Sequence, residues 1–316
     1  MILLNAVQGV LSIIILLAVG YYLSHKGWFD DNTGRLFSRM VTNLSLPAYM
    51  VSNMLSTYDK EALVHLANGL AAPYISMMIC YATGMLVAKL IKVGPNRFGT
   101  FSSMFGLSNT IFVGLPINLA LFGDQSIPYV MLYYIANTIL FWTIGTYGVR
   151  RDGEKGKLKI LTFENMKKIF SPPLTAILFA IVLILLGIKL PKSIMESCKY
   201  LGNMTTPLAV IFIGIVIYSV KLKSIKLTKD MTALLLGRFI LAPAIIMGIC
   251  YKLPLPVLMK QVFVIQAAMP VMTQTPIIAR MYGADYEYAA VMTTVTTIVS
   301  LFMIPIYMIL ISSGIF

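Results

Sequence analysis

A row of polar residues interrupts one apolar segment of the chain and is followed by two helix-breaking residues: Ser108, Asn109, Thr110, Gly114 and Pro116. Proline removes a backbone hydrogen bond from a helix, and glycine weakens the turn beside it. We therefore predict that the helix over residues 98–121 opens near residues 113–116. In an apolar medium, the carbonyl and amide groups freed by such a break must face protein or water.

A second apolar segment, residues 257–280, carries a matching set: Thr273, Gln274, Thr275 and Pro276. Pro276 lies 160 residues after Pro116. Two broken helices of opposite orientation would bring half-helix N-termini together, and their partial positive charge can hold an anion without a buried lysine. An ordinary proline kink explains either helix taken alone, but the matched pair favours a binding site.

Other residues repeat at the same offset of 160. Asn43 stands four residues before Pro47, and Asn203 stands four residues before Pro207. The repeats indicate a duplicated unit. Asparagine in a membrane helix bonds a neighbouring helix as readily as a substrate, so both roles stay open for Asn43 and Asn203.

Arg238 is the one basic residue predicted to lie well inside an apolar segment. Such a residue is a candidate for substrate binding or for a counter-charge. The alternative is snorkelling, because the long side chain can extend toward the membrane surface. The sequence leaves these two alternatives open.

The composition indicates an integral membrane protein. The chain is 58% hydrophobic and 12% charged, with a mean hydropathy of +0.84, and its apolar runs approach the roughly 20 residues that span a bilayer as a helix. Continuously apolar runs exclude the alternating pattern of a membrane barrel. We predict an all-α fold of ten transmembrane helices, over residues 3–23, 33–55, 62–88, 98–121, 127–149, 170–188, 198–219, 231–251, 257–280 and 288–312.

Basic residues are distributed unequally between the two predicted faces. One face carries most of the 25 Lys and Arg residues, whereas the other carries only Lys60, Lys189, Lys192, Lys199, Lys252 and Lys260. The positive-inside rule makes the first face cytoplasmic. Both termini then lie outside the cell membrane, and five helices per repeat give the repeats opposite orientations. The basic residues are dispersed over short loops facing the lipid bilayer, which argues against nucleic-acid binding. The first apolar segment lacks the basic start and the cleavage site of a removable signal peptide, so we expect it to be retained as a membrane span.

Several classes of chemistry have no support in the sequence. No Asp or Glu lies mid-span, and no enzyme, nucleotide-binding or paired-cysteine motif is present, so we expect no cofactor and no metal. We interpret Asp124 and Asp285 as caps of the helices that follow them. An inside-negative potential alone drives a monovalent anion out of a cell, by about 2.3 kcal/mol per 100 mV. Sodium held by carbonyls at the breaks, or proton coupling, stays open.

The residues around the two breaks, 109–117 and 269–285, resemble the auxin efflux carrier family, and the resemblance extends along the chain. It implies two inverted five-helix repeats with helices 4 and 9 crossed at the breaks, as in sodium/proton antiporters and bile-acid symporters. It also implies a scaffold domain (1–60 and 169–224), often dimeric and here expected to form a homodimer, and a transport domain (61–150 and 225–316). The strongly polar segment 151–168 is interpreted from its composition as the cytoplasmic linker between the two repeats.

That family includes plant exporters of auxin and bacterial permeases proposed for malate or malonate. In the plant members, an asparagine at the position of Asn109 helps to hold the substrate carboxylate. The short linker resembles the prokaryotic branch and favours a small organic acid over auxin.

These observations together predict a secondary transporter of organic anions, with an elevator-like movement of the transport domain and the substrate between the crossed breaks. A bile-acid-type sodium symporter is the first alternative, and a channel or intramembrane enzyme is the second. Met269 is the repeat partner of Asn109. We therefore predict that Asn109→Ala weakens anion binding and that Met269→Ala does not.

Overall fold

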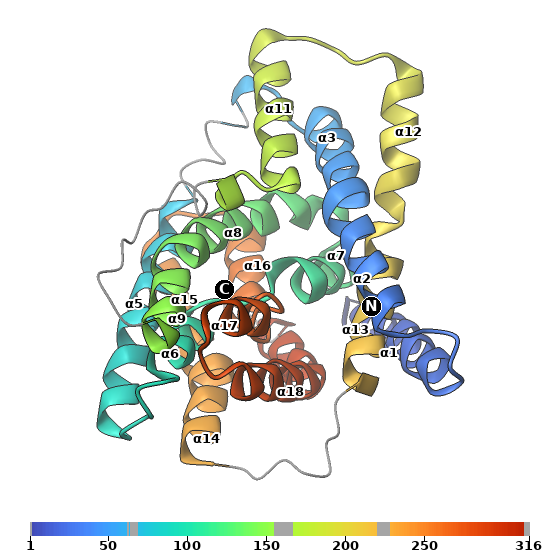
Figure 1. Ribbon diagram of the computed structural model, residues 1–316. Helices are drawn as coiled ribbons and strands as arrows, with labels where there is room; N and C mark the ends of the chain where they lie inside the picture. The colour runs from blue at the N-terminus through green and yellow to red at the C-terminus, as the bar shows by residue number, and fades with distance from the viewer. Residues whose placement is uncertain (1, 62, 64–68, 155–166, 220–227, 313–316) are drawn as a thin grey trace.

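The computed structural model describes residues 2–61, 63, 69–154, 167–219 and 228–312 (Figure 1). Every regular element within these ranges is a helix. The first part of the chain forms α1 (Ile2–His25), α2 (Asp31–Met40), η1 (Val41–Ser45), α3 (Leu46–Thr57), α5 (Ala71–Leu90), α6 (Phe98–Gly106), η2 (Thr110–Gly114), α7 (Leu115–Phe122), η3 (Asp124–Ser126), α8 (Ile127–Leu140), η4 (Phe141–Gly145) and α9 (Thr146–Gly153).

The second part continues with α11 (Pro172–Leu186), α12 (Lys192–Asn203), α13 (Thr205–Ser219), α14 (Lys229–Leu236), η6 (Gly237–Leu241), α15 (Ala242–Lys252), α16 (Val257–Ala267), α17 (Thr275–Tyr282) and α18 (Tyr286–Ser312). Five helical stretches are long and apolar enough to cross a membrane: 71–90, 124–153, 192–219, 229–252 and 286–311. The protein is therefore an all-helical, multi-span membrane protein. Most of the predicted linker lies outside the described residues.

Tight turns recur at the 160-residue offset seen in the sequence. Among the described residues, the glycines with positive φ form two such pairs, Gly27 with Gly187 and Gly123 with Gly283, and all four values lie between 70° and 76°. Glycine reaches this backbone region without steric strain. The repeat in sequence is therefore matched by positive φ at both pairs, although ψ differs between Gly123 (−168°) and Gly283 (18°).

The start of α2 is fixed by a capping box. The carboxylate of Asp30 accepts a hydrogen bond from the Thr33 backbone N–H at 2.8 Å, and the Thr33 hydroxyl lies 3.4 Å from the Asp30 backbone N–H. These bonds satisfy N–H groups that have no partner within the helix. The Thr33 N–H favours the ionised carboxylate and lowers the pKa of Asp30.

Close helix pairs depend on glycine. A β-carbon on Gly20 of α1 would lie 2.3 Å from the carbonyl oxygen of Ile211 in α13, and one on Gly214 would lie 2.2 Å from the Leu17 carbonyl. Similarly, Gly99 of α6 lies against Gly148 of α9. Any side chain at these positions would force the paired helices apart. Figure 1 shows α3, α11 and α12 side by side, and α3 packs on both of its neighbours.

The N-terminal end of α6 is tied to three other helices. Arg97 forms ion pairs with Asp230 at 3.1 Å and Asp285 at 2.9 Å, and its guanidinium lies 4.8 Å from the centre of the Tyr288 ring. The Asp152 carboxylate accepts hydrogen bonds from the Gly99 and Thr100 backbone N–H groups at 2.7 and 2.6 Å. These contacts fix one end of the helix that leads into the first break.

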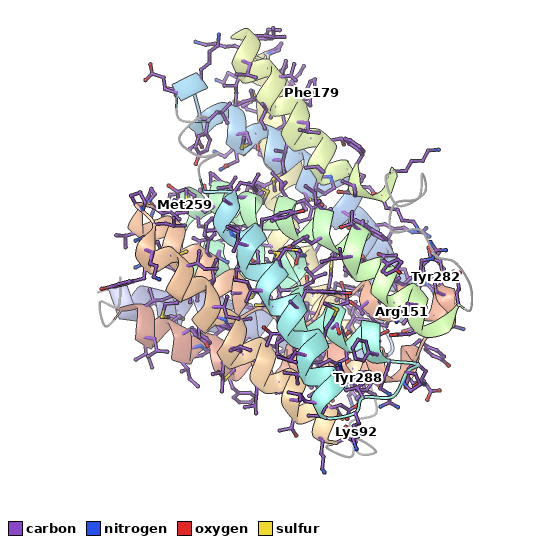
Figure 2. All side chains as sticks on the ribbon, turned by 90° about the vertical axis from the view of Figure 1, so that its left-hand side faces the viewer. Lys92, Arg151, Phe179, Met259, Tyr282 and Tyr288 are labelled. Carbon is purple, nitrogen blue, oxygen red and sulfur yellow. The ribbon has the colours of Figure 1, made fainter. Side chains whose placement is uncertain are left out.

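Figure 2 shows where some outer side chains lie along the molecule. Lys92 and Tyr288 lie toward one end, whereas Phe179 lies on α11 at the other. Phe179 is 51% exposed, as are many large apolar residues on the outer helices. A surface of this kind suits the hydrocarbon of a bilayer.

Candidate functional site

The first helix break lies earlier than the sequence predicted. The helix α6 ends at Gly106, Leu107 is extended (φ −117°, ψ 142°), and helical structure resumes at Thr110. The prediction of an opening near residues 113–116 was therefore wrong. Pro116 lies in the first turn of α7, directly after the π-helical segment η2 and six residues after helical structure resumes at Thr110. The proline therefore lies inside the second half-helix rather than in the break.

The second break follows the same plan. The helix α16 ends at Ala267 and α17 begins at Thr275, with Pro276 in its first turn. The intervening residues 268–274 are not helical. Both apolar segments that were singled out in the sequence therefore contain an interrupted helix.

The two breaks lie against each other. Ser108 and Val271 form an isolated antiparallel β-bridge, and the Asn109 backbone N–H donates to the Pro270 carbonyl at 2.8 Å. Segments more than 150 residues apart in sequence thus satisfy each other's freed backbone groups. This pairing explains how non-helical backbone is accommodated deep inside an apolar protein.

Buried side chains saturate most of the remaining backbone groups. Asn137 of α8 accepts from the Ser108 N–H and donates to the Ser108 carbonyl, both at 3.0 Å. Asn118 donates to the Gly114 carbonyl at 2.7 Å, and Gln266 donates to the Thr110 carbonyl at 3.2 Å. At the second break, the Thr296 hydroxyl accepts from the Val271 N–H at 3.1 Å.

These four residues were not among the candidates predicted from the sequence. Each is a polar side chain in an apolar segment, and each is 0% exposed. Their isolation in apolar surroundings was the available signal, because a buried amide or hydroxyl requires a partner. The sequence did not show that these partners would be the two breaks.

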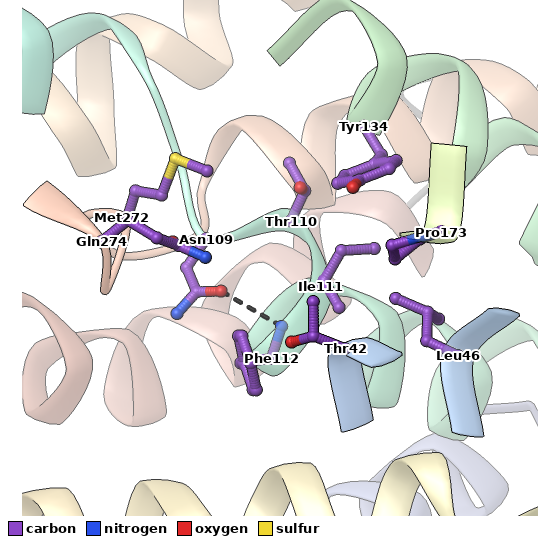
Figure 3. Close-up of a pocket in the computed structure, with 10 residues that line it drawn as sticks. All are labelled: Thr42, Leu46, Asn109, Thr110, Ile111, Phe112, Tyr134, Pro173, Met272 and Gln274. Atoms are coloured by element: carbon purple, nitrogen blue, oxygen red, sulfur yellow. Dashed lines mark hydrogen bonds between the residues drawn. The ribbon is translucent and has the colours of Figure 1, made fainter. Parts of the chain in front are cut away.

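Asn109 combines an anchored carbonyl with a free amide. Its Oδ1 accepts a hydrogen bond from the Phe112 N–H at 3.1 Å, which caps the helical segment η2 (Figure 3). This bond identifies the other terminal atom as Nδ2. The side chain is 3% exposed, yet Nδ2 has no hydrogen-bond partner. A buried amide without a partner is costly, by about 1–3 kcal/mol, so this donor is suited to a ligand.

A small cavity lies beside Asn109. Its volume is about 40 Å³, and Figure 3 shows the side chains that surround it: Thr42, Leu46, Asn109, Thr110, Ile111, Phe112, Tyr134, Pro173, Met272 and Gln274. These residues come from both breaks and from η1, α3, η2, α8 and α11. A cavity of this size accommodates water but not a dicarboxylate. A larger ligand therefore requires its walls to separate.

A larger cavity reaches the second break from one side of the molecule. Its volume is about 510 Å³, and it lies between helices α2 and α13 on one wall and α17 and α18 on the other. Thr273 and Pro276 line its inner part, and Arg35 and Arg39 line its wall on α2. Asp31 also lines this cavity, so the charged lining residues are two arginines and one carboxylate.

Four other candidate residues lie at the breaks but outside the small cavity. Ser108, Gly114, Pro116 and Thr275 are buried at the breaks, but none of them lines the small cavity. The Ser108 hydroxyl donates to the Gln266 carbonyl at 3.1 Å. A β-carbon on Gly114 would lie 2.3 Å from Gln266 Oε1. These residues therefore pack at the two breaks without contacting the small cavity.

Asn43 and Asn203 do not meet at the breaks. Asn43 is exposed on η1. Asn203 lines a separate cavity of about 280 Å³ together with Tyr49 and Asp124. There the Tyr49 hydroxyl donates to Asp124 Oδ1 at 3.1 Å, and Asp124 makes no capping bond to η3, contrary to the expected cap. Asp285 does cap its helix, because it accepts from the Tyr288 N–H at 3.0 Å.

Arg238 is completely buried, so the snorkelling alternative is wrong. Its guanidinium donates hydrogen bonds to the carbonyls of Phe105, Ala267 and Met269, at 2.9, 2.8 and 3.0 Å. It therefore contacts the ends of α6 and α16 rather than the cavity beside Asn109. Among the described residues, no group of three or more His, Cys, Asp or Glu side chains is placed to hold a metal ion.

The sequence matches a family of membrane transport proteins. The family model described as "Membrane transport protein" matches residues 5–308. The chain thus belongs to this family, the auxin efflux carrier family.

Two archaeal relatives match over nearly their whole length. An uncharacterized transporter of Methanocaldococcus jannaschii is 25% identical over 306 residues, covering 94% of this chain and 96% of the relative. An uncharacterized transporter of Methanothermobacter thermautotrophicus is 25% identical over 317 residues, covering 97% and 99%. This chain is therefore similar to complete transporters rather than to one part of them.

Proposed function

We propose that this protein is a secondary transporter of small organic anions, with carboxylates such as malate or malonate as the preferred class and auxin-like acids as the alternative. The substrate carboxylate binds at the crossing of the two breaks. The observation that carries this proposal is the Nδ2 of Asn109, which is buried and has no hydrogen-bond partner. Asn109 is the N-cap of η2, at the start of one half-helix.

The electrostatics of the crossing favour an anion. The segment η2 with α7 and the helix α17 both begin at the breaks. Each helix N-terminus carries about half a positive charge. The small cavity has no acidic lining residue. A carboxylate there would accept from Asn109 and would be stabilised by both half-helices, without the desolvation of a free lysine or arginine.

Transport requires the site to open alternately to the two sides. The small cavity is too small for a dicarboxylate, and the larger cavity approaches the second break from one side only. An elevator-like movement of the transport domain (61–150 and 225–316) against the scaffold (1–60 and 169–224) would widen the first cavity and carry Asn109 across the membrane. Exposed Asn43 lies on the scaffold, where a homodimer contact would cover it.

The orientation follows from the charge distribution. We place both termini outside the cell membrane and the Arg35–Arg39 end of the large cavity in the cytoplasm, in accordance with the positive-inside rule. Anions would then enter from the cytoplasm past two basic residues. Export driven by the membrane potential fits this arrangement, because the inside-negative potential favours the exit of an anion.

The test is a substrate screen in proteoliposomes. Current on a solid-supported membrane is measured for malate, malonate, lactate, succinate and indole acetate, with and without a sodium or proton gradient. Saturable current with a carboxylate supports the proposal, and saturable flux that also supports countertransport excludes a channel. Absence of current with all of these acids, in protein that remains folded, contradicts it, and current only with sodium points to the bile-acid-type symporter.

A further inference from the structure

Arg238 is the largest fully buried side chain among the described residues. It lies in η6, a π-helical segment between α14 and α15. The preceding residue, Gly237, leaves room for the Phe105 ring, which lies where a β-carbon would otherwise stand. This close approach brings the guanidinium to the end of α6.

The guanidinium is neutralised by helix ends rather than by a carboxylate. It contacts the carbonyl of Phe105 near the end of α6 and the carbonyl of Ala267 at the end of α16. None of the ion pairs in the described part of the chain includes Arg238. A helix C-terminus carries about half a negative charge, so two of them balance one guanidinium. This balance makes a buried arginine tolerable without an acidic partner.

The three carbonyls form the kind of site that binds a cation in broken-helix transporters. Unwound carbonyls and half-helix C-termini commonly coordinate a coupling sodium ion. Here the Phe105, Ala267 and Met269 oxygens all accept hydrogen bonds from Arg238, at 2.8 to 3.0 Å. The position is therefore already filled by a cation that belongs to the chain.

We propose that Arg238 is a tethered replacement for a coupling cation. It cancels the negative half-helix ends of the two breaks and leaves the positive half-helix ends facing the Asn109 cavity. Anion binding at the crossing then needs no sodium ion. This inference deepens the proposed function and rests on it for the part that concerns anions. Arg238 acts as a positioning residue, since it makes no contact with the cavity.

The test uses Arg238→Ala, which empties the cation position but keeps the three carbonyls. We expect a lower thermal unfolding temperature, which millimolar methylguanidinium or sodium raises by several degrees while choline does not. We also expect radioactive sodium to bind the variant and not the unaltered protein. Arg280→Ala is the matched control, because Arg280 is exposed on α17, and it should show neither effect.

Two further variants separate charge from packing. Arg238→Met fills part of the volume without a charge and should not respond to either cation, whereas Arg238→Lys should retain part of the stability. Full stability of Arg238→Met together with unchanged anion binding would overturn the proposal. Sodium-dependent anion transport by the unaltered protein would also overturn it, even where Arg238→Ala cannot be folded.

The cation readouts do not depend on the transported substrate. Added cations can raise the unfolding temperature of Arg238→Ala, and sodium can bind to this variant, even if no carboxylate binds. In that case the proposed substrate class fails and the tethered-cation assignment stands. The reverse result, carboxylate transport without any cation rescue, leaves the proposed function intact and removes the role of Arg238.

Discussion

At both helix breaks, backbone N–H and carbonyl groups lack helical partners, and the two breaks satisfy them with different side chains. At the first, Asn137 saturates both backbone groups of Ser108, and Asn109 caps its own half-helix while keeping a free amide. At the second, a hydroxyl from Thr296 saturates Val271, and the Met269 carbonyl is held by Arg238. The first break thus carries the free donor, and the second carries neutralised acceptors. Duplicated segments can therefore diverge into a binding half and a supporting half.

Loss of the Asn137 side chain should have the largest effect of the substitutions considered, and it concerns stability. In Asn137→Leu, the Ser108 N–H loses its partner, at about 1–3 kcal/mol. The Ser108 carbonyl loses one bond, at about 0.5–1.5 kcal/mol, and keeps the one from the Thr110 N–H at 3.0 Å. We expect the free energy of unfolding to fall by about 1.5–4.5 kcal/mol, measured by denaturant titration in mixed micelles. An unchanged free energy would show that the first break is held by the β-bridge alone.

Removal of the Asn109 amide should have the next largest effect, and it concerns binding. A hydrogen bond to a charged group contributes about 1.5–3 kcal/mol, so Asn109→Ala should weaken carboxylate binding by roughly 10- to 150-fold. Asn43→Ala is the control, because Asn43 is exposed and does not line the cavity. Titration calorimetry with the best substrate of the screen gives both values. Equal weakening in the two variants would remove the special role of the first break.

Thr296→Val tests the corresponding contact at the second break. The substitution keeps the shape and leaves only the Val271 N–H without its acceptor, so the free energy of unfolding should fall by about 1–2 kcal/mol. This loss should be smaller than that of Asn137→Leu in the same titration. A larger loss would show that the second break is the more fragile of the two.

The smallest effect is expected at Met269. Met269→Leu roughly conserves volume and keeps the backbone carbonyl that accepts from Arg238. Carboxylate affinity should remain within about threefold of the unaltered protein, whereas Asn109→Ala loses it. Met269→Ala should also retain affinity, although its cavity lowers stability. A loss of affinity in Met269→Leu that matches Asn109→Ala would indicate two equivalent half-sites.

The apolar segments and the existence of two broken helices were predictable from the sequence, because hydropathy and paired prolines report directly on them. The positions of the breaks were not. Pro276 lies in the first turn of α17, where a proline fits best, and Pro116 lies after the π-helical segment η2. Both prolines therefore stand after the breaks rather than within them.

The partners of the candidate residues were also hidden from the sequence. Asn43 and Asn137 are both lone amides in apolar segments, yet one is exposed and the other is 0% exposed. Only the packing of α8 against the first break separates them. Arg238 is a similar case, since its carbonyl partners come from two helix ends that are distant in sequence.

The central claim is that Asn109 binds a carboxylate at the crossing without a coupling ion. The most direct test compares the current of the unaltered protein with that of Asn109→Asp, in sodium-free buffer at equal pH on both sides of the membrane. The substitution keeps the shape and replaces the donor by a negative oxygen. The account predicts saturable carboxylate current from the unaltered protein and none from Asn109→Asp. Equal currents from both proteins, or current that appears only with sodium or a proton gradient, would contradict it.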